Sequence, residues 1–115
     1  MSGFSVCIPP PPSLNNAFVN VRSGGRRKSD RYRKWTSLAV GLIKVEVPAV
    51  QRCGGEIMVD IDFPSKSKAD IDNLIKGILD ALVASTRVDD DRNVCELRVT
   101  RKREGDDARV FVRPA

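Results

Sequence analysis

Residues 56–84 constrain the fold most tightly, because a strand pattern changes to a helix pattern within them. Apolar and polar side chains alternate over residues 56–63, EIMVDIDF, which is typical of a strand with one buried face. Pro64 ends that strand. Residues 71–84 then predict a helix with a broad apolar stripe. The stripe consists of Ile71, Leu74, Ile75, Ile78, Leu79, Leu82 and Val83. A strand followed directly by such a helix predicts a domain that mixes sheet and helix.

Two further elements are expected before this pair. Residues 4–8 form a short apolar strand stopped by four prolines, which suits the edge of a sheet. A helix capped by Ser29 or Asp30 runs to about residue 45 and ends before a proline. Its apolar stripe is expected to be Trp35, Leu38, Ala39 and Leu42. The glycine-containing basic stretch 19–28 between them predicts a mobile loop.

Two strands are expected at the end of the sequence. Residues 94–103 and 108–113 have strand character, and the polar turn at 104–107 between them predicts a hairpin. The full order is then β-α-β-α-β-β. We therefore expect one α/β (α+β) domain over residues 1–115, in which a small mixed β-sheet packs with two helices.

The sequence contains no histidine and three cysteines, Cys7, Cys53 and Cys95. The lack of histidine excludes Ser-His-Asp and Cys-His catalysis and removes the usual zinc ligands. The cysteines are odd in number and widely spaced, so neither a zinc site nor a disulfide framework is indicated, and we expect reduced thiols. Cys7 and Cys95 are expected within strands as small hydrophobic residues. A metal would have to be held by carboxylates, which favours Mg²⁺, Mn²⁺ or Ca²⁺.

Charge is unevenly distributed along the sequence. Residues 1–55 have a net charge of +7, whereas residues 56–115 have a net charge of −2 and contain nearly all the acids. A basic surface beside an acidic cluster suits a protein that attracts a polyanion and performs metal chemistry on it. No apolar stretch has the length of a membrane span, and the first residues do not resemble a signal peptide. We expect a cytoplasmic protein without a membrane partner.

Asp70 and Asp72 lie where the basic loop turns into the second helix. Two carboxylates two residues apart across such a turn are able to reach one cation, whereas inside a helix they would diverge. Lys76 follows one helical turn after Asp72 on the same face, where its ammonium could contact a phosphate or an attacking water. The competing interpretation is that both aspartates only cap the helix. Asp80 is expected to be a solvated surface residue on another face.

Three consecutive acids, Asp89, Asp90 and Asp91, precede the strand at residues 94–103. Their mutual repulsion costs stability unless a cation or an arginine neutralises them. The segment is therefore either a metal locus or a solvated turn.

Basic residues gather around the glycine-containing loop. They are Arg22, Arg26, Arg27, Lys28, Arg31, Arg33 and Lys34, with Lys66 and Lys68 in the loop before the second helix. Such a run predicts a flexible arm that contacts DNA phosphates, and the alternative is an ordinary soluble loop. Trp35 belongs to the apolar stripe, so it is assigned to the core rather than to base stacking.

Three segments together resemble the RusA family of Holliday junction resolvases. IPPPPSLNNAF resembles the family's opening after its first strand, and ADIDNLIKGILDAL resembles its D-x-D-N-x-x-K-x-x-x-D-A-L segment. VDDDRNV followed by ELRVTRK resembles its acidic turn before a basic strand. Each segment alone is a weak signal, but the three in this order and spacing are highly specific.

The resemblance implies a set of site residues. Asp70 and Asp72 would bind Mg²⁺, with Mn²⁺ as a possible substitute, and Lys76 would be needed for cleavage. Asp91 would be the third ligand, because counting back from the strand matches Asp90 and Asp91 to the family's acidic pair and leaves Asp89 as the extra residue. The resemblance also implies a homodimer, which matches the two strands that a four-way junction presents for cutting.

The expected function is a Mg²⁺-dependent endodeoxyribonuclease that resolves Holliday junctions in DNA recombination and repair by paired symmetric nicks. The metal would activate water and stabilise charge at the scissile phosphate, leaving a 5′-phosphate and a 3′-hydroxyl. Two alternatives remain open. One is a non-catalytic protein of the same fold that binds branched nucleic acid. The other is a nuclease that acts on other branched DNA.

Overall fold

The computed structural model describes residues 3–12, 18–20, 26–28 and 30–115 of the chain. Its strands are β1 (Phe4–Ile8), β2 (Phe18–Asn20), β3 (Arg26–Lys28), β4 (Ile57–Pro64), β5 (Val94–Arg103) and β6 (Ala108–Pro114). Its helices are α1 (Asp30–Glu46) and α2 (Ile71–Ala84), and the short 3₁₀ turns are η2 (Ala49–Gln51) and η3 (Asp91–Asn93). The two expected helices and the four expected strands, β1, β4, β5 and β6, are confirmed. Their boundaries differ from the expected ones by no more than one or two residues.

The main sheet has the strand order β1-β6-β4-β5. β1 and β6 are antiparallel, β6 and β4 are antiparallel, and β4 and β5 are parallel. The prediction of a small mixed sheet is confirmed, and so is the place of β1 at an edge. The β4–α2–β5 segment forms the crossover unit that a parallel pair requires.

The predicted hairpin of the last two strands is wrong. β4 lies between β5 and β6, so the turn at residues 104–107 crosses the end of β4 instead of joining neighbours. The physical reason is the apolar character of β4. Ile57, Val59, Ile61 and Phe63 are at most 2% exposed, and a central position with a ladder on each side protects such a strand best.

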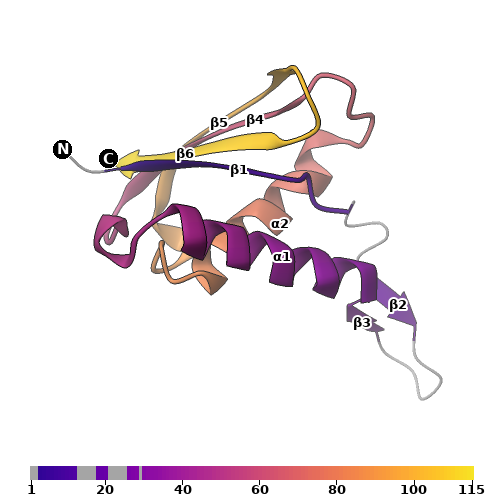
Figure 1. Cartoon of the computed structure of the whole chain (residues 1–115), viewed down its shortest axis with the longest axis horizontal. Helices are drawn as coiled ribbons and strands as arrows, with labels where there is room; N and C mark the ends of the chain where they lie inside the picture. Colours follow the sequence, from indigo (N-terminus) through magenta and orange to yellow (C-terminus); the bar gives the residue numbers. More distant parts are fainter. Residues whose placement is uncertain (1–2, 13–17, 21–25, 29) are drawn as a thin grey trace.

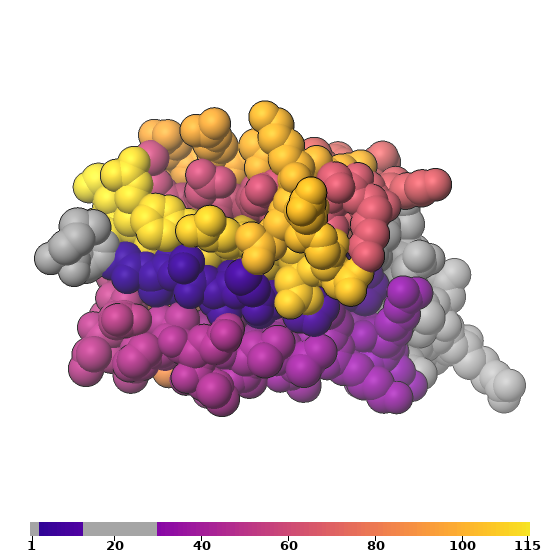
Figure 2. Space-filling model, turned by 45° about the horizontal axis from the view of Figure 1, so that its top comes forward, coloured from indigo at the N-terminus to yellow at the C-terminus, as the bar shows by residue number. Residues whose placement is uncertain are grey.

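Both helices pack on the same face of the sheet, as Figure 1 shows. Figure 2 shows β1 as a strip at the surface between α1 and β6. The core fills the space between the sheet and the helices, where α2 buries Leu74, Ile78, Ala81 and Leu82. The opposite face of the sheet is not covered by either helix, and there Asp60 and Asp62 are partly exposed, as the alternation predicts.

The buried stripe of α1 differs from the expected one. Trp35 and Ala39 are buried as predicted, but Leu38 is 51% exposed, and Tyr32 and Ile43 complete the buried stripe. The indole Nε1 of Trp35 donates to the carbonyl of Pro9 at 2.8 Å. This hydrogen bond fixes the rotation of α1 against the proline segment, and it leaves Leu38 at the side of the helix.

The stretch expected to be a mobile loop contains two short strands. β2 and β3 pair antiparallel, with Phe18 opposite Lys28, and they lie near the start of α1 (Figure 1). The prediction of a loop is therefore wrong for residues 26–28, RRK, which form a strand. Residues 21–25 lie outside the described part of the chain.

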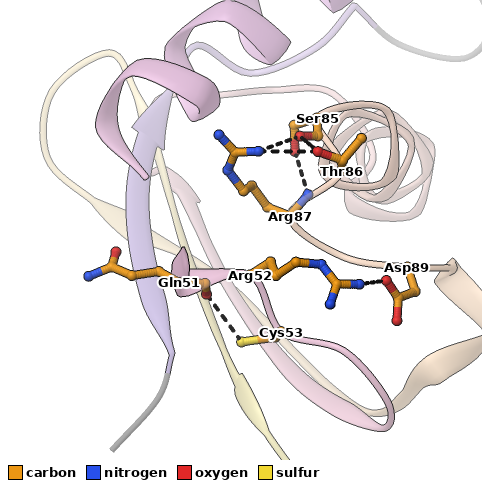
Figure 3. Close-up of polar contacts among 7 residues, drawn as sticks. All are labelled: Gln51, Arg52, Cys53, Ser85, Thr86, Arg87 and Asp89. Atoms are coloured by element: carbon orange, nitrogen blue, oxygen red, sulfur yellow. Dashed lines mark hydrogen bonds and ion pairs between the residues drawn. The ribbon is translucent and has the colours of Figure 1, made fainter. Parts of the chain in front are cut away.

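A buried arginine joins the ends of the two helices. Arg87 is 9% exposed, and its Nε donates to the carbonyl of Val47 at 2.9 Å, just beyond α1. Its Nη1 donates to the carbonyl of Ser85, at the end of α2, at 3.1 Å (Figure 3). The charge is thus solvated by carbonyl dipoles, which is how a buried guanidinium avoids a large desolvation cost.

The three cysteines are free, as expected. Cys53 is buried and Cys7 is half-buried in β1. Cys95 lies in strand β5, as expected, and is exposed. No helix in the described residues is sufficiently long and apolar to cross a membrane.

Candidate functional site

Asp70 and Asp72 stand at the start of α2. Asp70 occupies the N-cap position, with φ −63° and ψ 134°, yet its side chain makes no capping hydrogen bond. Both residues are exposed. Within the described residues neither carboxylate has an ion-pair partner. The capping interpretation therefore lacks its defining contact for Asp70, and two unneutralised anions remain at the helix start.

Arg101 holds the loop that carries these aspartates. From β5, its guanidinium donates to the carbonyl of Ser67 at 3.1 Å and to that of Ala69, the residue directly before Asp70. The Nε of Arg101 is buried without a partner among the described residues. Sequence reasoning did not single out Arg101, since nothing in the strand pattern separates it from the other basic residues of β5.

Lys76 brings the second helix into contact with the acidic segment. Its Nζ lies 3.1 Å from Oδ2 of Asp91, which belongs to η3. The same ammonium lies 3.1 Å from Oδ1 of Asp80, one turn further along α2. The hydrogen bonds to Asp91 and then to Asp80 raise the pKa of Lys76 above its ordinary value. Lys76 is therefore held as a cation between two carboxylates.

Asp80 is not the solvated residue that the sequence suggested. Besides its ion pair with Lys76, its carboxylate lies close to the phenol of Tyr32 from α1. Burial, followed by the negative charge of Asp80, raises the pKa of Tyr32. The spacing of Lys76 and Asp80, four apart on a helix, was the signal that could have indicated this pair.

The three consecutive acids have three different partners. Asp89 forms an ion pair with Arg52, which follows η2 (Figure 3). Asp90 caps η3: it accepts from the backbone N–H of Arg92 at 2.9 Å and pairs with its guanidinium, and these contacts lower the pKa of Asp90 to about 2. Asp91 contacts Lys76. Of the three, Asp91 is thus the one directed toward α2.

The metal-site prediction is only partly reflected in the geometry. No group of three or more Asp, Glu or Cys side chains among the described residues is gathered closely enough to hold a metal ion. The donor chemistry nevertheless fits Mg²⁺, which prefers carboxylate oxygens. Among the described residues, the carboxylates of Asp70 and Asp72 have no ion-pair partner, and both lie within two helical turns of Lys76. A third carboxylate, that of Asp91, contacts Lys76. The assignment of Asp70, Asp72 and Asp91 as ligands stays a prediction.

The structure describes the side chains of only some of the candidate DNA-contacting residues. Lys66 pairs with Asp106 of the turn after β5, and Lys68 is exposed. Arg26, Arg27 and Lys28 make up strand β3, but the structure does not describe their side chains. Arg22 lies outside the described residues.

A hollow lies elsewhere, on the uncovered face of the sheet. It measures about 400 Å³ and is lined by Asp60, Asp62, Arg98, Thr100, Lys102, Arg109 and Phe111. Asp62 accepts hydrogen bonds from the hydroxyl of Thr100 at 2.8 Å and from the backbone N–H of Lys102 at 2.9 Å. The Asp62 carboxylate is therefore already hydrogen-bonded within the sheet. The residues around Lys76 do not line this hollow.

Comparisons with known proteins agree with the sequence resemblance. The family model described as endodeoxyribonuclease RusA matches residues 8–113. The chain is also 30% identical over 105 residues to the crossover junction endodeoxyribonuclease rusA of Enterobacteria phage HK97. That match covers 88% of this chain and 84% of the phage protein.

Proposed function

The chain belongs to the RusA family of endodeoxyribonucleases, and from that premise we propose that it resolves Holliday junctions by paired, symmetric, Mg²⁺-dependent nicks. The reaction would be hydrolysis of one phosphodiester bond in each of two strands. Its products would be 5′-phosphate and 3′-hydroxyl ends, which a ligase is able to seal. DNA recombination and repair are the processes that need such a reaction.

The contact between Lys76 and Asp91 is the observation that carries the proposal. These residues lie on different elements, α2 and η3, and their side chains meet at 3.1 Å. Asp72 precedes Lys76 by one helical turn, and Asp70 precedes the helix. The elements that resemble the family's catalytic segments are thus neighbours in the fold, as a shared site requires.

Asp70, Asp72 and Asp91 would hold the metal. Mg²⁺ bound there supplies Lewis acidity and charge stabilisation for phosphodiester hydrolysis. The three side chains are half-exposed or exposed, so DNA phosphates have access to them. Their common negative charge would favour a bound cation.

Lys76 would stabilise negative charge on the reacting phosphate. Its side chain is 53% exposed, so its ammonium is able to reach a ligand while one carboxylate partner is retained. A lysine is already protonated at neutral pH, and the contacts with Asp91 and Asp80 raise the pKa of Lys76 further. A fixed cation beside the phosphate favours the transition state over the ground state, because negative charge grows there during attack.

DNA binding would depend on basic residues. We assign phosphate contacts to Arg22, Arg26, Arg27 and Lys28, which precede α1 in the sequence, and to Lys66 and Lys68, which precede α2. Four-way junction DNA is the expected partner, together with a second copy of this chain. The cytoplasm is the proposed compartment, since the substrate is DNA.

A non-catalytic protein that binds branched DNA is the competing function. The two proposals are separated by incubating the purified protein with a four-way junction, a fork and a linear duplex at matched salt, with Mg²⁺ or with EDTA. We expect junction cleavage in Mg²⁺, no cleavage in EDTA, and little cleavage of fork or duplex.

Asp72→Asn is the control for contaminating nuclease, since it should bind the junction without cutting it. Junction binding without cleavage by the wild-type protein in Mg²⁺ and in Mn²⁺ would favour the non-catalytic function. Equal cleavage of all three substrates would favour a general nuclease of branched DNA.

A further inference from the structure

Lys76 has two carboxylate partners of different kinds. Asp91 belongs to η3 and is one of the proposed metal ligands, whereas Asp80 lies on the same helix as Lys76. The two Nζ–Oδ distances are both 3.1 Å. Because a bound cation would compete with Lys76 for Asp91, the contact to Asp80 is the one that persists when the metal is present.

Asp80 lies close to the other helix. Tyr32 of α1 is 2% exposed, and the negative charge of Asp80 lies near enough to its phenol to raise the phenol pKa, after burial itself. The approach is close: a Cβ placed on Gly77 of α2 would lie 3.4 Å from the Tyr32 hydroxyl oxygen. The phenol therefore sits against the α2 backbone within one turn of both Lys76 and Asp80.

Lys76 needs a partner if its ammonium is to be held in one place. A lysine side chain has four rotatable bonds and loses much rotamer freedom when it is fixed. The Asp80 side chain is only 34% exposed, and it lies near the buried phenol of Tyr32. Asp80 is therefore a more ordered partner than a fully exposed carboxylate.

We propose that Asp80 is the positioning residue that holds Lys76 at the active site when a metal occupies Asp91. This inference rests on the proposed function. Asp80 would not touch the substrate itself, and its effect would pass through the Lys76 ammonium. The chain would thereby link the packing of α1 on α2 to the rate of cleavage.

A double-mutant cycle tests the coupling of Asp80 to Lys76. Asp80→Asn should lower kcat for junction cleavage by about tenfold, with KM and junction affinity nearly unchanged, because neighbours in one ion-pair network are energetically coupled. In a Lys76→Ala background the same change should have no further effect on kcat. Tyr32→Phe should lower kcat by about threefold, and Asp80→Glu should restore part of the rate. An equal loss in both backgrounds would mean a purely structural role and would overturn the inference.

Asp107→Asn is the matched control, because it removes one exposed carboxylate in the turn after β5. It should leave kcat unchanged. An independent measurement does not depend on cleavage: NMR relaxation of the Lys76 ¹⁵Nζ in the full chain. The ammonium should be more mobile in Asp80→Asn than in the wild-type protein, with Mg²⁺ present.

The two measurements separate the inference from the proposed function. If the wild-type protein does not cleave junctions, the proposed function fails, and the NMR comparison still decides whether Asp80 orders Lys76. If the wild-type protein cleaves and neither kcat nor Lys76 mobility changes in Asp80→Asn, the positioning role is wrong.

Discussion

Consecutive aspartates of one short segment have separate physical tasks. Asp89 neutralises Arg52, Asp90 caps η3, and Asp91 meets Lys76. Local charge repulsion is relieved by this division, since each carboxylate has its own cationic partner. The same division determines which of the three is available to the chemistry at α2.

We expect Asp91→Asn to reduce junction cleavage by at least about 100-fold, because loss of even an outer-sphere partner of a metal commonly costs 10–100-fold. Junction affinity in EDTA should change little. Asp90→Asn is the matched control: its amide oxygen is able to accept from the Arg92 N–H, so cleavage should stay near the wild-type rate. Single-turnover cleavage measures both. Wild-type turnover by Asp91→Asn would move the third ligand to a neighbouring aspartate.

Asp62 should make stability depend on acid pH. Its hydrogen bonds from the Lys102 N–H and the Thr100 hydroxyl lower its pKa in the folded protein. A lowered folded pKa means that the contribution is complete above the unfolded value of about 4 and is lost as the pH falls through the folded value.

Asp62→Asn should therefore lower the free energy of unfolding by about 1 kcal/mol at neutral pH, since the group is partly exposed. Its deficit relative to the wild-type protein should shrink below pH 4. Urea unfolding of both proteins at pH 7 and pH 3 measures the difference. A deficit that stays constant between these pH values would show that the ionised form has no special role.

At the scale of elements, α2 is positioned by a close contact with the proline segment. A Cβ on Gly77 would lie 2.8 Å from Cβ of Pro11, a distance that real side chains do not tolerate. Glycine at this position lets the proline segment lie directly on the helix that carries Lys76. The helix also depends on Arg101, which fixes the loop at its start.

Gly77→Ala should destabilise the protein by about 1–3 kcal/mol, because overpacking outweighs the gain in helix propensity. Gly41→Ala on α1 is the matched control, since nothing lies within 4 Å of its Cβ position and the residue is exposed. The control should gain about 0.5–1 kcal/mol. Thermal unfolding of both variants measures the contrast. Equal stabilisation of both would mean that Pro11 does not pack on α2.

The sequence patterns predicted the helices and strands more accurately than they predicted which of these elements are neighbours in space. The periods of β4 and α2 are strong, so both were predicted nearly to the residue. The hairpin of β5 and β6 was wrong because a turn signal reports only local geometry, whereas pairing with β4 is decided by burial across the whole sheet. The predicted burial of Leu38 was wrong because the apolar stripe of α1 does not itself show which of its flanks faces β1.

The candidate site was predictable to a similar degree. Asp70, Asp72, Lys76 and Asp91 were marked by sequence spacing and by the family resemblance, and the fold brings Lys76 to Asp91. Tyr32 and Arg101 were not, because each acts through a contact between elements far apart in the sequence. Such contacts leave no periodic pattern.

At the scale of the whole molecule, we expect a homodimer with two equivalent sites. A four-way junction has approximate two-fold symmetry, so a two-fold dimer is able to address two strands of like polarity at once. The apolar stripe of α2 packs largely within its own chain, since Ile71, Leu79 and Val83 lie half-buried against the core. The exposed apolar residues Leu97 and Phe111 leave other surfaces for a partner.

Sedimentation equilibrium should give about twice the chain mass of 12.7 kDa. Mixed dimers of wild-type and Asp70→Asn subunits should nick one strand of a junction and seldom resolve it, since each site would serve one strand. Gel analysis of nicked and resolved products measures this. A monomer that still cuts both strands together would contradict the dimer.

Mapping of the cut positions decides whether the protein resolves junctions. A synthetic four-way junction is labelled at the 5′ end of one strand at a time, and the wild-type protein is added with Mg²⁺ or with EDTA. We expect nicks at symmetric positions in two opposing strands, in Mg²⁺ only, with products that DNA ligase reseals. Binding of the junction with no nicks in any of the four strands, in Mg²⁺ or in Mn²⁺, would contradict this expectation.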